Sequence, residues 1–173
     1  MDYTGKKCLV AYFSRRGKNY VSGSIVNLAM GNTQIVAERL QELTGADLFE
    51  IDTVKKYPLE YQPATQVAQD ELDTGARPEL SENLADIGQY EVVFLGYPNW
   101  WGTMPMAVWT FLESYDFSGK IILPFCTHEG SGLGRSESDV KKLCPAAIVK
   151  RGLAIRGSQV KSAEKSMVEW LGK

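Results

Sequence analysis

The sequence predicts an α/β fold of the doubly wound type, a three-layer sandwich in which helices cover both faces of a parallel sheet. Short apolar runs at residues 6–14, 90–97 and 119–127 have the length and composition of strands buried on both faces. Segments with helical periodicity alternate with these runs. Strands that alternate with helices along one chain form a layered α/β domain rather than a helix bundle or a β-sandwich.

The first half of the chain begins with the apolar run at 6–14, which we expect to be a central strand. Residues 18–30 show no periodic pattern and are interpreted as an irregular insertion. A helix is predicted over 31–43, because apolar residues recur there at helical spacing and Gly45 provides a stop. Residues 46–52 alternate between apolar and polar side chains, which is typical of a strand near a sheet edge.

The second half contains a β-α-β unit, in which a predicted helix at 104–115 separates the strands 90–97 and 119–127. A fifth strand is expected at 146–156, followed by a closing helix that Ser158 caps. The buried stripe of that helix is predicted to consist of Val160, Ala163, Met167 and Leu171. No repeat or linker interrupts the pattern, so residues 1–173 are expected to form a single domain.

Composition limits the class of partner. The chain of 173 residues has 19 Lys and Arg against 21 Asp and Glu, a net charge of −2, which is not the electrostatic signature of a nucleic-acid or membrane-surface protein. Neither a signal peptide nor an apolar run of membrane-spanning length is present, so a soluble, cytoplasmic protein is expected. The three cysteines, at positions 8, 126 and 144, form no C-x-x-C pair, which argues for reduced thiols and against a metal site.

Ligands of doubly wound sheets bind at the carboxyl ends of the strands, so the loops there are the candidate site. The first loop has the chemistry of a phosphate cradle. Ser14, Asn32 and Thr33 offer side-chain donors, Gly17 and Gly31 permit tight turns, and a helix N-terminus favours an anion. The alternative is that Asn32 and Thr33 only cap the helix. Neither G-x-G-x-x-G nor G-x-x-x-x-G-K-[ST] occurs here, so no dinucleotide site or P-loop is indicated.

The second loop, "GYPNWWGTMP", contains two adjacent tryptophans that offer a flat face to an aromatic ligand. The alternative is that Trp100 and Trp101 simply cover the core. In the third loop, "THEGSG", Thr127, Ser131 and glycine N–H groups have donors for the carbonyl edge of a ring. His128 is the only histidine of the chain, and its alternative interpretation is a surface residue without a role.

The segments "LVAYFSRRGKN" with "GNT", "FLGYPNWWGTMP" and "FCTHEGSGLG" together resemble the flavodoxin-like FMN-binding proteins, in particular a bacterial branch with a longer first loop. The resemblance implies a five-stranded parallel sheet of order 2-1-3-4-5, with FMN at the switch point between the first and third strands. It implies phosphate contacts by Ser14, Arg15, Gly17, Asn32 and Thr33. It implies that one side of the isoalloxazine is lined by Pro98, Asn99, Trp100, Trp101 and Gly102. It implies that the other side is completed by Thr127, His128, Glu129, Gly130, Ser131 and Gly132.

Two features depart from the family's usual first loop. The insertion separates Gly17 from Gly31, so Asn19, Ser22 and Ser24 either approach the phosphate or belong to a surface loop. The pair Arg15 and Arg16 adds charge where electron-carrier flavodoxins are described as using mostly N–H and hydroxyl groups, and a guanidinium can pair with a phosphate in a bidentate manner. We expect only one of the two arginines to point inward.

The resemblance implies low-potential electron transfer to redox partner proteins or a small-molecule acceptor, by a monomer or weak dimer. The tryptophans are expected to favour a neutral flavin ring, and Gly102 or the peptide between Asn99 and Trp100 to present a backbone group to flavin N5. The alternative is an FMN-dependent NAD(P)H:quinone reductase of the Trp-repressor-binding-protein type, with His128 as proton donor. A third hypothesis is a binding module that has lost FMN. The acidic residues between positions 60 and 86 form either a docking surface or, as we expect, a solvated helix face.

Overall fold

The computed structural model of the protein describes residue 3 and residues 5–172. Six strands form a parallel sheet: five follow the order β4-β1-β5-β6-β7, and the sixth, β8, pairs with the second half of β6, whereas β7 pairs with its start. These strands are β1 (Cys8–Tyr12), β4 (Asp47–Glu50), β5 (Val92–Pro98), β6 (Ile121–His128), β7 (Ile148–Val149) and β8 (Leu153–Arg156). The arrangement confirms the predicted α/β fold and the 2-1-3-4-5 order of the main strands.

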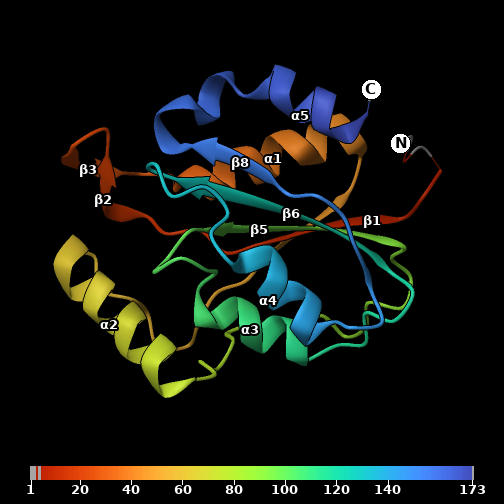
Figure 1. Ribbon diagram of the computed structural model, residues 1–173, viewed down its shortest axis with the longest axis horizontal. Coiled ribbons are helices and arrows are strands. Elements are labelled where there is room, and N and C mark those ends of the chain that lie inside the picture. The colour runs from red at the N-terminus through yellow and green to blue at the C-terminus, as the bar shows by residue number, and fades with distance from the viewer. Residues whose placement is uncertain (1–2, 4, 173) are drawn as a thin grey trace.

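The helices lie in two layers with the sheet between them (Figure 1). One face carries α1 (Asn32–Thr44) and α5 (Glu164–Leu171), and the other face carries α3 (Met106–Glu113) and α4 (Ser136–Leu143). The remaining α-helix, α2 (Tyr61–Thr74), lies beside the edge of the sheet that is formed by the carboxyl ends of β1, β5 and β6. Within the described part of the chain, no helix has the length and apolar character needed to cross a membrane.

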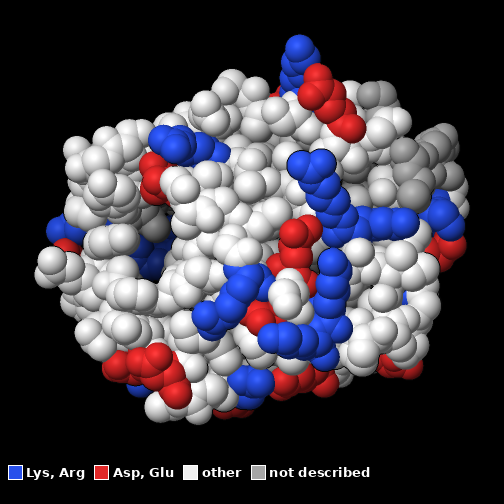
Figure 2. Space-filling model, viewed as in Figure 1, with Lys and Arg blue, Asp and Glu red and all other residues white. Residues whose placement is uncertain are grey.

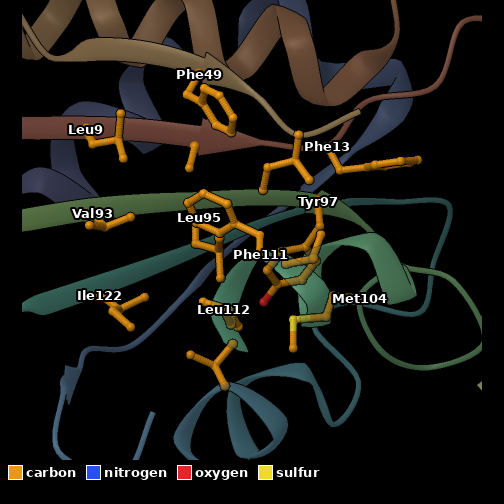
Figure 3. Packing of buried hydrophobic residues seen from close by; sticks show 14 of the residues in the cluster. Leu9, Phe13, Phe49, Val93, Leu95, Tyr97, Met104, Phe111, Leu112 and Ile122 are labelled. Carbon is orange, nitrogen blue, oxygen red and sulfur yellow. The ribbon is translucent and has the colours of Figure 1, made fainter. Parts of the chain in front are cut away.

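Alternate residues of β1 face opposite layers, which explains why its sequence is apolar throughout. Leu9 in the strand and Phe13 directly after it belong to the hydrophobic cluster beneath the sheet, which also contains Tyr97, Met104 and Phe111 (Figure 3). Cys8, Val10 and Tyr12 belong to the second cluster, under α1 and α5. A strand with two buried faces has no polar positions in its middle, and this is the origin of the run at 6–14.

The predicted insertion at 18–30 is a β-hairpin, so its interpretation as an irregular stretch was wrong. Strand β2 (Gly17–Val21) pairs antiparallel with β3 (Ser24–Leu28) in register, and Ser22 and Gly23 form the two-residue turn. Both turn residues have positive φ, 49° and 89°, as the favoured hairpin turns require. The pattern was hidden because the hairpin lies outside the main sheet, so few of its side chains are buried and alternation is weak.

Two predictions for the C-terminal region need correction. The strand expected at 146–156 is broken into β7 and β8, whose registers against β6 differ by one residue, and between them the N–H of Gly152 donates to Glu137 Oε1 at 2.7 Å. Ser158 does not cap the closing helix, since a 3₁₀ segment, η1 (Gly157–Ser162), precedes α5. The predicted stripe is nevertheless buried, because the change of helix type keeps its members on one face: Val160, Ala163, Met167 and Leu171.

Gly96 offers a test of the packing at the centre of the sheet. It lies opposite Phe125 of β6, and a Cβ atom at this position would come within 2.1 Å of the Phe125 ring. We expect Gly96→Ala to lower the free energy of unfolding by about 1–3 kcal/mol in urea titrations, since the buried ring has to move. The double variant with Phe125→Leu should lose less stability than the two single variants combined, and strictly additive losses would contradict this contact.

Candidate functional site

A pocket of about 480 Å³ lies at the carboxyl ends of β1, β5 and β6. Figure 2 shows a hollow on the left of the view, between the β2–β3 hairpin and α2. The volume is in the range of cofactor sites. Its lining combines loop residues with residues of the hairpin and α2: Arg15, Asn19, Tyr20, Asn32, Thr33, Tyr61, Ala64, Thr65, Ala68, Pro98, Asn99, Trp100, Trp101, Thr127, His128, Glu129 and Ser131. The three predicted loops are therefore brought together.

Hydrogen bonds connect the three loops and fix their positions relative to one another. The hydroxyl groups of Thr33 and Thr127 lie 2.8 Å apart and join the start of α1 to the end of β6. The Asn99 amide donates to the carbonyl of Gly132 at 2.8 Å, and its backbone N–H donates to the carbonyl of Thr127 at 2.9 Å. Each of the three loops is thus bonded to at least one other, and the floor of the pocket is a connected polar network.

The start of α1 is a candidate anion site. Ser14 Oγ accepts the N–H of Gln34 at 3.1 Å, and no side-chain cap is made at the N-cap residue Gly31, so the interpretation of Asn32 and Thr33 as caps is not what the structure shows. A Cβ atom at Gly31 would lie 2.2 Å from Ser14 Oγ, so only glycine allows this close approach. The N–H groups of Asn32 and Thr33 belong to the first turn, which has no intrahelical acceptors for them.

Arg15 is the arginine that lines the pocket, whereas Arg16 lies 3.7 Å from Glu50 at the exposed side. The Arg15 guanidinium donates to the carbonyls of Lys18, Pro58, Leu59 and Glu60, which connects the base of the hairpin to the start of α2. Burial lowers the pKa of this guanidinium, but arginine remains protonated in proteins. Its Nε is buried and has no partner among the described residues, so Arg15 gives the pocket a fixed positive charge with one unused donor.

The two tryptophans occupy different environments. Trp100 is half-buried, and its ring packs edge-on against Phe13 at 5.2 Å and Tyr57 at 5.0 Å between centroids. Trp101 is 49% exposed and donates its indole N–H to the carbonyl of Thr65 in α2 at 3.0 Å. Both line the pocket, but Trp100 covers the core as well, and only Trp101 has a large free surface.

The tryptophan turn is a tight two-residue loop closed by a bridge between Trp100 and Thr103. Its central residues, Trp101 and Gly102, have φ values of 53° and 82°, which is the left-handed region used in type I′ turns. Gly102 does not line the pocket, and its N–H donates to Asn99 Oδ1 at 3.0 Å. Its carbonyl accepts the N–H of Arg135 at 2.8 Å, so the hypothesis that Gly102 presents a backbone group to a ligand requires that one of these two hydrogen bonds breaks.

His128 lines the pocket, in contrast to the interpretation of a surface residue without a role. Its Nδ1 accepts the N–H of Gly130 at 2.8 Å, which assigns the imidazole proton to Nε2. Burial and the neighbouring charge of Arg156 lower the pKa of His128 below its usual value of 6.5. The imidazole is consequently neutral at pH 7 and offers a hydrogen-bond donor rather than a positive charge.

The hairpin and α2 form walls of the pocket, of which the sequence offered only Asn19 as a candidate. Tyr20 of β2 and Tyr61 of α2 lie 6.2 Å apart between ring centroids with an interplanar angle of 31°. The remaining wall residues follow the helical spacing from Tyr61 and are all uncharged: Ala64, Thr65 and Ala68. This spacing in "YQPATQVAQ" indicates a helix face, but sequence alone does not say that the face is turned toward the loops.

The tip of the hairpin reaches the third loop, since the N–H of Ser22 donates to Glu129 Oε2 at 3.0 Å. Of the three insertion residues considered above, Asn19 lines the pocket, Ser22 binds Glu129, and Ser24 is exposed. Some predicted site residues lie beside the pocket without lining it and shape its loops instead: Ser14, Gly17, Gly102, Gly130 and Gly132.

Comparisons with known proteins agree with this architecture. The family model described as Flavodoxin matches residues 7–173. The chain is similar to a candidate flavoprotein from Bacteroides eggerthii, with 30% identity, a TM-score of 0.75 and coverage of 98% of this chain and 99% of that one. A second candidate flavoprotein, from Bacteroides uniformis, shows 26% identity, a TM-score of 0.73 and coverage of 98% and 100%.

A flavoprotein from Lactobacillus acidophilus, crystallised in complex with FMN, has the same fold, with 20% identity, a TM-score of 0.68 and coverage of 98% and 100%. No curated protein matches the chain. The fold and the pocket define a doubly wound α/β protein with a pocket at the switch point of the sheet, where such folds bind their ligands. Since the family model covers nearly the whole chain, the protein belongs to the flavodoxin family.

The single histidine allows a direct test of the pocket's electrostatics. We expect the imidazole of His128 to titrate below pH 6.5 in the folded protein, as followed by ¹H NMR. The unfolded chain then binds a proton more readily, so the stabilising contribution of His128 is present above pH 6.5 and is lost as the pH falls through the folded-state pKa. A midpoint above 6.5 would contradict a half-buried, neutral imidazole, and His128→Gln should remove the pH dependence in this window.

The hydrogen bond between Ser22 and Glu129 is expected to restrict the motion of the hairpin. A hydrogen bond to a carboxylate is worth about 1.5–3 kcal/mol, so Glu129→Ala should accelerate hydrogen exchange of the β2 and β3 amides at least tenfold. Amides of α3, which covers the opposite face of the sheet from α1, serve as the internal control. Glu129→Gln keeps an acceptor and should give a smaller effect, and equal exchange in all three proteins would disprove the contact in solution.

Proposed function

We propose that this pocket binds FMN and that the protein is an electron carrier of the flavodoxin family. The observation that carries the proposal is the combination, in one pocket, of a helix N-terminus, a half-buried arginine and an exposed tryptophan ring. The FMN complex of the Lactobacillus acidophilus relative supports the same cofactor.

The residues present fit the phosphate of FMN. The first-turn N–H groups of Asn32 and Thr33, the fixed charge of Arg15 and its unused buried Nε suit a dianion. Gly31 lets the first loop lie close against the N-terminus of α1, because a side chain at this position would collide with Ser14. These groups would hold the phosphate through N–H donors and one positive charge. The arginine would therefore add a charge to a loop whose other donors are neutral.

The residues also fit a flat heteroaromatic ring. Trp101 offers a largely free ring surface, Tyr20 and Tyr61 add aromatic walls, and the uncharged face of α2 excludes water on that side. Polar groups for ring carbonyls and nitrogens come from Asn99, Thr127 and Ser131. When bound, FMN supplies the one- and two-electron redox chemistry, and these residues orient it and set its environment.

His128 favours the carrier over the reductase. In the reductase hypothesis this residue gives a proton to the reduced acceptor, which requires an imidazole that is protonated near neutral pH. Its lowered pKa and the hydrogen bond at Nδ1 instead support a neutral ring that donates from Nε2. A neutral imidazole binds and orients a ligand but is a weak acid, so electron transfer without proton donation by the protein is the better-supported activity.

The cofactor is tested by the absorption spectrum of the purified protein and by adding FMN to the apoprotein. We expect a yellow protein with flavin bands, or stoichiometric FMN uptake that quenches flavin fluorescence. Riboflavin, which lacks the phosphate, should bind at least a hundredfold more weakly, because the contacts to Asn32, Thr33 and Arg15 are lost. A protein that binds neither form would support the hypothesis of a module without flavin.

Substitutions of the two tryptophans should have different effects on FMN binding and on stability. Trp101→Ala is expected to raise the Kd for FMN about tenfold, which corresponds to about 1.4 kcal/mol of stacking, while costing the apoprotein less than about 1 kcal/mol of stability. Trp100→Ala should instead cost about 3 kcal/mol of stability, because its ring packs on Phe13 and Tyr57. The opposite pattern, with Trp101 important for folding alone, would refute this division of roles.

Carrier and reductase are distinguished by their kinetics. We expect two separate one-electron midpoint potentials in an anaerobic titration and NAD(P)H oxidation close to the rate with free FMN. Rapid NAD(P)H turnover with a quinone, lost in His128→Gln but kept in a variant of an exposed residue such as Lys165→Gln, would establish the reductase instead.

A further inference from the structure

Resting on the proposed function, we propose that Asp139 of α4 is a positioning residue that fixes the tryptophan turn and thereby presents Trp101 to the flavin. Asp139 does not line the pocket, and its role is exerted through Thr103, the residue that closes the turn. The carboxylate lies on the first helix after the third loop, so it links the second and third loops beneath the pocket.

Asp139 and Thr103 form a buried contact. Asp139 is 3% exposed and Thr103 is fully buried, and the Thr103 hydroxyl donates to Asp139 Oδ2 at 2.6 Å. Burying a carboxylate is unfavourable unless it is hydrogen-bonded and faces positive charge. Arg135 Nε lies 3.2 Å from the same oxygen, and Lys142 Nζ lies 3.9 Å from Oδ1, so the N-cap residue of α4 and a lysine of its last turn compensate the buried charge.

Two hydrogen bonds attach the tryptophan turn to the start of α4. Trp100 and Thr103 exchange backbone hydrogen bonds of 2.8 Å and 3.2 Å that close the two-residue loop. The carbonyl of Gly102 accepts the N–H of Arg135 at 2.8 Å, next to the Thr103 side-chain bond. Two adjacent residues of the turn are thus anchored to residues 135 and 139, one by its backbone and the other by its side chain.

The anchoring is needed because of the conformation of Trp101. A bulky residue rarely adopts φ of 53°, and such a conformation persists only where the surroundings impose it. The Trp101 side chain has a single polar anchor, the indole hydrogen bond to Thr65. If Thr103 is released, the turn can relax toward φ values that suit tryptophan, and the ring leaves the orientation in which it faces the pocket.

The experiment uses Thr103→Val, which removes the hydroxyl with little change of shape, and Asp139→Asn, which removes the charge. Both are expected to raise the Kd for FMN about tenfold and to shift the flavin midpoint potentials, in proteins that still unfold cooperatively. Thr103→Ser retains a hydroxyl and should bind FMN within about threefold of the wild type. Glu137→Gln is the matched control, since Glu137 lies on the same helix but binds the N–H of Gly152.

A merely structural role is excluded by a double-mutant cycle. In a Trp101→Ala background, Asp139→Asn should change the Kd by less than about twofold, because the ring that it positions is gone. Equal losses with and without Trp101, or an unchanged Kd in a folded Asp139→Asn protein, would overturn the proposal.

The apoprotein provides a readout that is independent of FMN. The indole N–H signal of Trp101, one of four in the ¹H–¹⁵N spectrum and assigned by its loss in Trp101→Phe, should shift and exchange faster in Asp139→Asn. If the wild type binds no FMN but this signal responds, the proposed function fails and the positioning role stands. An unchanged indole signal would overturn the positioning role whatever the cofactor.

Discussion

The parallel pairing of β1 with β5, and of β5 with β6, is the constraint on which the site depends. These three strands run in the same direction in adjacent register, so their carboxyl ends meet at one edge and their following loops converge there. The loops are separated by about 85 and 30 residues in sequence, yet the hydroxyl groups of Thr33 and Thr127 meet at 2.8 Å. Strand pairing is driven by burial of both sheet faces, so the stability of the core and the geometry of the pocket have the same origin.

The loops that follow the parallel strands supply the floor of the pocket, and the hairpin and α2 supply its walls. The β2–β3 hairpin extends from the first loop, and Arg15 joins its base to the residues that lead into α2. At its other end the hairpin binds Glu129 through Ser22. A segment outside the main sheet is thus fixed at both ends, and Asn19 and Tyr20 between those ends become pocket residues.

Charge is distributed in a way that suits a bound anion with a neutral ring. The α1 N-terminus and Arg15 provide the positive end, whereas α2 turns an uncharged face to the pocket although acidic residues lie elsewhere along the same helix. His128, which would be a cation in water at moderately acidic pH, is kept neutral by burial and by Arg156. Asp139 carries its charge below the tryptophan turn, where it is balanced by Arg135 and Lys142 and acts on the turn through Thr103.

The sequence by itself determined the fold class, the strand order through resemblance, and most of the pocket-lining loop residues, because buried strands and glycine-rich loops leave strong local patterns. Only the tertiary structure decided that residues 18–30 are a hairpin, that Arg15 rather than Arg16 faces the pocket, and that Trp100 covers the core while Trp101 stays free. These outcomes depend on neighbours distant in sequence, such as Pro58 for Arg15, Phe13 for Trp100 and Asp139 for Thr103. Such contacts leave no periodic or compositional signal in the segments that make them. For this reason Asn19 is the one wall residue that the sequence offered as a candidate, whereas Tyr20 and the residues of α2 were absent from the prediction.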